Sequence, residues 1–128
     1  MRSDRGGMTI LVIGWVAVIA VIGVAATSVG SLLAARELAY TAADAAALAA
    51  AVATYPPAAP GSPVGLAAEY AARNGSRLIT CQCQVDLSIR PRTVTVITAR
   101  QVEVPLLGPV TVRGAARSEF DPGRWLGG

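Results

Sequence analysis

The run ILVIGWVAVIAVIGV, residues 10–24, decides the architecture of this chain. It lies within thirty consecutive residues that carry no charge, between Arg5 and Arg36. About 20 apolar residues span a bilayer core as a helix, and the Val, Ile and Leu residues of this run favour insertion by about 3–6 kcal/mol. We therefore expect a transmembrane helix over residues 9–33, rather than the buried core helix of a soluble protein.

The charges that flank this helix predict its orientation. Arg2, Arg5 and the α-amino group outnumber Asp4 on the amino side, whereas Arg36 and Glu37 cancel on the other side. The positive-inside rule places the more basic flank in the cytoplasm. We expect a single-pass plasma-membrane protein with a cytoplasmic N-terminus and an extracytoplasmic C-terminal part.

A cleaved secretory signal is the alternative, because residues 24–26 (Val-Ala-Ala) would suit a signal peptidase. The helical pattern, however, continues well past that point, since residues 27–53 contain no proline and are rich in alanine. We expect one helix over residues 8–54, roughly 70 Å long. Its outer half has an apolar stripe at helical spacing, which comprises Leu38, Thr41, Ala45, Leu48 and Val52.

The composition excludes several kinds of chemistry. Of the 128 residues, 53% are hydrophobic and 15% are charged; there is no histidine, and all eleven basic residues are arginines. Histidine general-base catalysis, histidine metal ligation and lysine Schiff-base chemistry are thereby removed. The arginines are scattered, and aromatic residues are few, so a nucleic-acid partner is not expected. We expect no enzyme activity, no cofactor and no metal.

A small head follows the helix. Residues 55–63 contain four prolines and form a linker. A short helix is expected over residues 64–73, and Asn74-Gly75 supplies its left-handed stop. Residues 79–90 alternate strictly and predict a strand with one buried face, comprising Ile79, Cys81, Cys83, Val85, Leu87 and Ile89.

Two further strands complete the expected head. One covers residues 93–104, with a bulge or twist where Ile97 and Ala99 break the alternation, and the next begins at Val110 after the turn at 105–109. The fold class is thus α+β, with a long N-terminal transmembrane helix, a short helix and a three-stranded antiparallel sheet. The head would cover residues 64–120 and pack on the alanine-rich half of the long helix, and residues 121–128 would form a flexible tail.

The sequence resembles the TadE/TadG-like proteins, which are pilin-like components of Tad (Flp-type) pilus assembly. The basic leader, the membrane helix that runs into AADAAALAAA (residues 42–51) and the small head carry this resemblance over nearly the whole chain. Its most specific part is residues 36–51. The AARNG stretch (71–75), the cysteine strand and the PLLG turn (105–108) are similar to the actinobacterial TadE-like branch.

The resemblance implies a processing site in the leader, residues 1–7. The sequence RGGMTILV (5–12) is similar to a prepilin leader, in which a prepilin peptidase would cut between Gly7 and Met8. Glycine suits cleavage of an extended segment that enters a helix. Related pilins carry glutamate at the fifth mature position, which here is Val12, so a minor subunit or an unprocessed assembly protein is implied. An ordinary glycine before a membrane anchor is the alternative.

Cys81 and Cys83 are the only cysteines. Residues i and i+2 of a strand have Cα atoms about 6.5–7 Å apart, so a bond between these two would require distortion. Buried free thiols, an intermolecular disulfide and a metal site remain open, with free thiols favoured. In the related branch, the strand cysteine often pairs with one at the start of the second helix, but residues 62–66 contain no cysteine here.

Two more features are candidates for contacts. Leu106 and Leu107 lie in a turn, where apolar side chains have no local core, so they predict a contact surface for a partner subunit or for the outer membrane leaflet. Small residues in the membrane helix, Gly14, Gly23 and Gly30, would permit close helix approach but are common in such helices.

The function implied is that of a pilin-like, membrane-anchored component (a minor pilin, pseudopilin or assembly factor) of a Tad/Flp-type pilus or related secretion system. Its expected partners are the bilayer, other pilin-like subunits and membrane proteins of pilus assembly. The alternative is a secreted or anchored ligand-binding module, with the thiols or the small sheet as its site.

Overall fold

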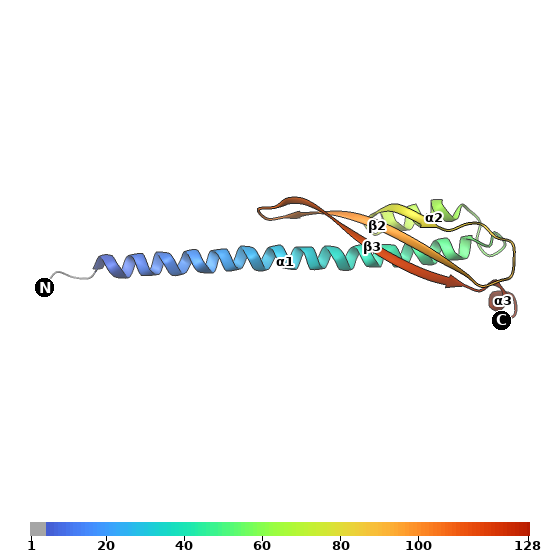
Figure 1. Cartoon of the computed structure of the whole chain (residues 1–128), viewed down its shortest axis with the longest axis horizontal. Coiled ribbons are helices and arrows are strands. Elements are labelled where there is room, and N and C mark those ends of the chain that lie inside the picture. Colours follow the sequence, from blue (N-terminus) through green and yellow to red (C-terminus); the bar gives the residue numbers. More distant parts are fainter. Residues whose placement is uncertain (1–4) are drawn as a thin grey trace.

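A single helix, α1 (Arg5–Ala53), runs through most of the length of the molecule in the computed structural model, which describes residues 5–128 (Figure 1). The later elements gather around its C-terminal half. They are α2 (Pro63–Arg73), β1 (Arg77–Gln82), β2 (Arg92–Val104), β3 (Gly108–Phe120) and α3 (Pro122–Leu126). The predicted α+β class, with one long helix, a short helix and three antiparallel strands, is confirmed.

The sheet is antiparallel and has the order β1-β2-β3. β2 and β3 form one long hairpin, paired without interruption from Arg92↔Phe120 to Val104↔Gly108. The C-terminal half of α1 contacts both of these strands, and α2 packs against α1 and β1. The hairpin extends back along α1, toward its N-terminal half (Figure 1).

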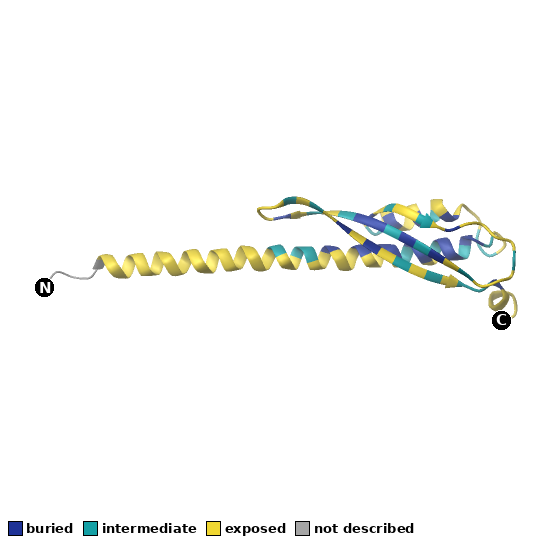
Figure 2. Ribbon diagram, viewed as in Figure 1, coloured by how far each residue is buried: buried dark blue, intermediate teal, exposed yellow. Residues whose placement is uncertain are grey.

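The core of the head is built largely from alanine, and it lies where the sheet covers α1 (Figure 2). The buried residues of the helix include Ala35, Ala39, Ala42, Ala43, Ala46, Ala47 and Ala50. The apolar stripe noted in the sequence is not the face that the sheet covers, because Leu38 and Leu48 are 46% and 62% exposed. The reason is close packing: a Cβ atom at Gly114 would lie 2.2 Å from the carbonyl oxygen of Ala39, so only small residues fit between strand and helix.

β2 keeps one alternating phase toward the helix, so the bulge expected between Ile97 and Ala99 is absent from its pairing with β3. Thr98 occupies the inward position there and is fully buried. Its hydroxyl donates a hydrogen bond of 2.9 Å to the carbonyl of Ala39, which satisfies it within the core. The register shift lies in the neighbouring strand instead, between Leu78 and Thr80 of β1.

The strand expected over residues 79–90 ends at Gln82, and most of its predicted buried face is exposed. Val85, Leu87 and Ile89 are 55%, 70% and 62% exposed. The chain leaves the sheet because polar groups fix it elsewhere. The N–H of Asp86 donates to the carbonyl of Thr54 at 2.9 Å, and the guanidinium of Arg92 donates to carbonyls of this segment.

Local caps set the ends of the short elements. The hydroxyl of Ser62 accepts the N–H of Gly65 at the start of α2, and Gly75, with φ 70°, follows its end as predicted. The expected flexible tail contains a helix instead, α3, because the Asp121 carboxylate accepts the N–H groups of Gly123 and Arg124.

Candidate functional surfaces

The N-terminal half of α1 is an apolar rod that the rest of the described chain leaves largely exposed (Figure 2). Ile13, Trp15 and Ile22 are all more than 60% exposed, and the most apolar window of the helix has no buried residue. Among residues 5–128, this is the one helix long and apolar enough to cross a membrane. The buried-core alternative fails on this point, and the helix fits a single-pass membrane anchor.

The glycines of this rod have open surroundings. A Cβ atom added at Gly14, Gly23 or Gly30 would meet nothing within 4 Å. These positions leave shallow steps on the surface of the helix, where a second helix could approach closely.

Gly7 and Met8 lie in the first turns of α1, not in the extended segment that the sequence suggested. The described part of the helix begins at Arg5. The first turn of a helix has no preceding turn to pair with, and two glycines weaken it further, so this end opens at little cost. Arg2 and Asp4, which support the predicted orientation, lie outside the described residues.

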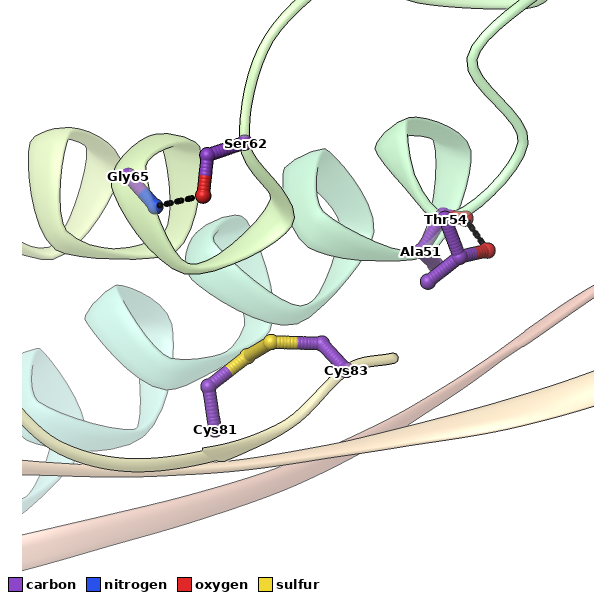
Figure 3. Close-up of a disulfide and its surroundings, with 6 residues drawn as sticks. All are labelled: Ala51, Thr54, Ser62, Gly65, Cys81 and Cys83. Atoms are coloured by element: carbon purple, nitrogen blue, oxygen red, sulfur yellow. Dashed lines mark hydrogen bonds between the residues drawn. A yellow bond between two sulfur atoms is a disulfide. The ribbon is translucent and has the colours of Figure 1, made fainter. Parts of the chain in front are cut away.

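Cys81 and Cys83 form an intrachain disulfide, which corrects the expectation of free thiols and the argument from strand geometry (Figure 3). β1 ends at Gln82, so the second cysteine is no longer in strand conformation, and the Cα atoms lie 5.3 Å apart. That distance is within the ordinary range for a disulfide. The bridge lies against the core between sheet and helices, and Cys83 is buried.

A polar loop, residues 83–91, follows the disulfide. The carboxylate of Asp86 accepts the backbone N–H and the hydroxyl of Ser88, both at 2.8 Å, and these bonds hold the pKa of Asp86 below its ordinary value. The guanidinium of Arg92 joins the loop to the end of α1 by donating to the carbonyl of Thr54. The sequence analysis did not identify Asp86 or Arg92 as interacting residues. The partners of Arg92 are backbone carbonyls, which leave no residue pattern in the sequence.

The described residues include no group of three or more His, Cys, Asp or Glu side chains that could hold a metal ion. A hollow beside the disulfide is lined by Thr54, Val64, Cys81, Asp86 and Arg92, among others. It is open to solvent, and its lining combines one cation, Arg92, and one carboxylate, Asp86, with uncharged side chains. It has none of the paired acid–base groups that hydrolytic or proton-transfer chemistry requires.

Leu106 and Leu107 lie at the tip of the β2–β3 hairpin and are 92% and 69% exposed. The tip does not point into open space. It lies beside α1, where its leucines and Ala20, Val21 and Val24 line one apolar groove. The hydroxyl of Ser28 donates to the carbonyl of Pro105 at 3.5 Å.

These features define a class of protein: an α+β head carried on a long helix whose exposed apolar half fits a membrane anchor. Within that class, residues 6–53 match the family model described as "Putative Flp pilus-assembly TadE/G-like". Residues 6–53 are therefore similar to a TadE/G-like domain, and this match supports a component related to Flp pilus assembly. The family is one of structural and assembly proteins rather than of enzymes.

The match confirms the resemblance over the long helix, including its most specific part, residues 36–51. The head lies outside the matched residues, although the resemblance was expected over nearly the whole chain. No curated protein and no solved structure matched the chain.

Proposed function

We propose that this chain is a pilin-like subunit, either a minor pilin or pseudopilin or an assembly factor, of a Tad/Flp-type pilus or a related secretion system. The observation that carries the proposal is the division of α1. Its N-terminal half is apolar and largely exposed, and its alanine-rich C-terminal half is the spine of the head. A helix of this kind can be stored in a bilayer and later bundled with the helices of other subunits.

A second exposed strip supports bundling along the head as well. Leu33, Leu38 and Leu48 lie on α1 within the length of the head but are 57%, 46% and 62% exposed. Leu38 and Leu48 continue the apolar surface of the membrane half past Arg36 and Glu37, the first charges that follow the span. In an assembled fibre, helices of neighbouring subunits would cover this strip, with the bilayer covering only the N-terminal half before assembly.

The proposed topology is a cytoplasmic N-terminus, a plasma-membrane span over about residues 9–33 and an extracytoplasmic head. The basic leader supports it through the positive-inside rule. The Cys81–Cys83 disulfide supports it independently, because disulfides persist outside the reducing cytoplasm. A reporter that is active only outside the cytoplasm, fused after Gly128, should be active. Activity of a cytoplasmic reporter alone would contradict both the topology and the pilin-like role.

We further propose that a prepilin peptidase cuts between Gly7 and Met8. The open end of α1 allows the first turn to unwind into a protease, and the absence of glutamate at Val12 favours a minor subunit over a repeating one. The direct test is mass spectrometry of the mature N-terminus in cells that contain the pilus machinery. The expected chain begins at Met8, and Gly7→Arg should retain the leader.

The matched control for that experiment is Gly6→Arg, which adds the same side chain to the leader one residue before Gly7 and should leave the cut in place. A mature chain that begins at Thr27 would indicate a secretory signal and would favour the anchor-free ligand-binding alternative. Retention of Met1 would indicate an uncleaved anchor and would restrict the proposal to an assembly factor.

The pilus partners are tested by crosslinking. Leu48→Arg places a charge on the exposed strip without entering the core, so the head should stay folded while crosslinks to other pilin-like subunits are lost. Glu69→Arg is the control, because Glu69 lies on the exposed surface of α2 and outside the strip. Equal crosslinking by both variants would contradict the role proposed for this strip.

A further inference from the structure

The tip of the β2–β3 hairpin, residues 104–109, reaches the part of α1 that the membrane must contain. The groove between tip and helix is lined on the helix side by Ala20, Val21, Val24 and Ala25. We propose that the hairpin tip inserts into the head-side leaflet of the bilayer, with Leu106 and Leu107 in contact with lipid acyl chains. This inference rests on the proposed membrane anchor and adds a second membrane contact, made by the head.

Helix length fixes the depth of the tip. On the N-terminal side of the groove, the uncharged part of α1 consists of residues 6–19, which extend for about 21 Å. A bilayer core is about 30 Å thick, so this segment is too short to cross it alone. Any span of sufficient length therefore includes residues 20–25, and the hairpin tip that lies against them falls within the same leaflet.

The residue composition and backbone hydrogen bonding of the tip suit that depth. From Val104 to Val112 the chain carries no charge. Pro105 and Pro109 have no backbone N–H, and the N–H of Leu107 donates to the carbonyl of Val104 at 3.1 Å. The turn thus presents few of the unpaired donors that make irregular backbone costly in contact with lipid.

The conformation of Leu106 gives a second, independent indication. Its φ is 69°, and it is the only described residue other than glycine with a positive φ. The bond from Leu107 to Val104 makes it the third residue of a turn with proline second, a position that favours glycine or asparagine. Because Leu106 is 92% exposed, packing within the chain does not compensate for this conformation. We infer that its apolar side chain contacts something outside the chain.

Lipid is the occupant that the arrangement favours over a second protein. The tip is continuous with the exposed apolar surface of α1 at the same depth, and a bilayer covers both surfaces at once. The nearest charges on the two strands, Glu103 and Arg113, follow directly where the uncharged tip ends. Insertion would hold the head against the membrane surface in one orientation until the helix is withdrawn.

Tryptophan fluorescence of the full-length protein in vesicles tests the proposal. Leu106→Trp is placed in a background with Trp15→Phe and Trp125→Phe, and the vesicles contain phosphatidylcholine with or without bromine on its acyl chains. We expect the emission of L106W to shift to the blue and to be strongly quenched by the brominated lipid. Leu87→Trp in the same background is the matched control, because Leu87 is 70% exposed but lies in the loop that follows β1. It should remain unquenched.

Two further variants keep the test decisive. Leu107→Trp probes the same tip at a second position, in case the turn does not tolerate Trp at 106. The chain that retains Trp15 alone reports on the anchor, independently of the tip.

Quenching of Trp15 without quenching of either tip variant would overturn tip insertion and leave the proposed membrane anchor unaffected. Tip emission that is shielded from aqueous acrylamide but unaffected by brominated lipid would identify a protein partner and also overturn it. An unquenched Trp15 would refute the anchor itself, and tip insertion with it.

Discussion

Gly114→Ala should separate the sheet from the long helix. Gly114 lies on β3 directly over α1, and a Cβ atom there would lie 2.2 Å from the carbonyl oxygen of Ala39 and 2.7 Å from the nitrogen of Tyr40. Both are helix backbone atoms, so no side-chain rotation relieves the contact. Restoring an ordinary contact distance requires a movement of more than about 1 Å.

The size of the effect follows from that movement. Overpacking of a core costs about 1–3 kcal/mol. The displaced sheet also breaks the hydrogen bond from the Thr98 hydroxyl to the carbonyl of Ala39. Leaving this fully buried hydroxyl without a partner costs a further amount of about 1–3 kcal/mol. Together these changes should lower the free energy of unfolding by about 2–6 kcal/mol, a large share of what a head this small can have.

Pulse proteolysis of the full-length protein in detergent, over a series of urea concentrations, measures this loss as a lower midpoint. Ala115→Val is the control on the same strand, because Ala115 is exposed and a larger β-branched residue suits that position. The reasoning is refuted if Gly114→Ala unfolds at the wild-type midpoint, or loses no more than Ala115→Val. The sheet would then not rest directly on the helix backbone.

Three further predictions concern the tip, the disulfide and the polar loop. Changing both Leu106 and Leu107 to serine should alter the free energy of unfolding of the head, obtained from urea unfolding, by less than about 1 kcal/mol, because little burial is lost; a larger loss would show that these leucines belong to the core. The intact mass should be lower than that of the reduced chain by the two thiol hydrogens, with no disulfide-linked dimer on a non-reducing gel, and reduction should cost less than roughly 2 kcal/mol because the closed loop is so short. The pKa of Asp86, followed by NMR, should lie below 3.8, so its support of the loop is complete above that pH and is lost as pH falls through the lower folded value; a pKa at or above 3.8 would contradict the bonds from Ser88.

The sequence by itself determined the elements whose causes are local. The charge-free run and the absence of proline make one long helix, and the proline-rich linker and Gly75 delimit the second helix. These signals act through helix propensity, backbone geometry and transfer to lipid, which depend on a residue and its near neighbours. The family resemblance rests on the same part of the chain, residues 6–53.

The tertiary structure alone decided which surfaces meet. The sequence showed an apolar stripe that includes Leu38 and Leu48, yet the sheet packs on the alanine face of the helix, where it approaches closely, and these leucines remain outside. Alternation predicted a strand to residue 90, yet bonds to Thr54 and from Arg92 draw the chain away after Gln82, and that departure brings Cys83 within disulfide distance of Cys81. The turn at Leu106 was visible in the sequence, but its position beside Val21 and Val24 depends on the length and register of the whole hairpin. Such contacts join residues far apart in the chain, so no local pattern encodes them.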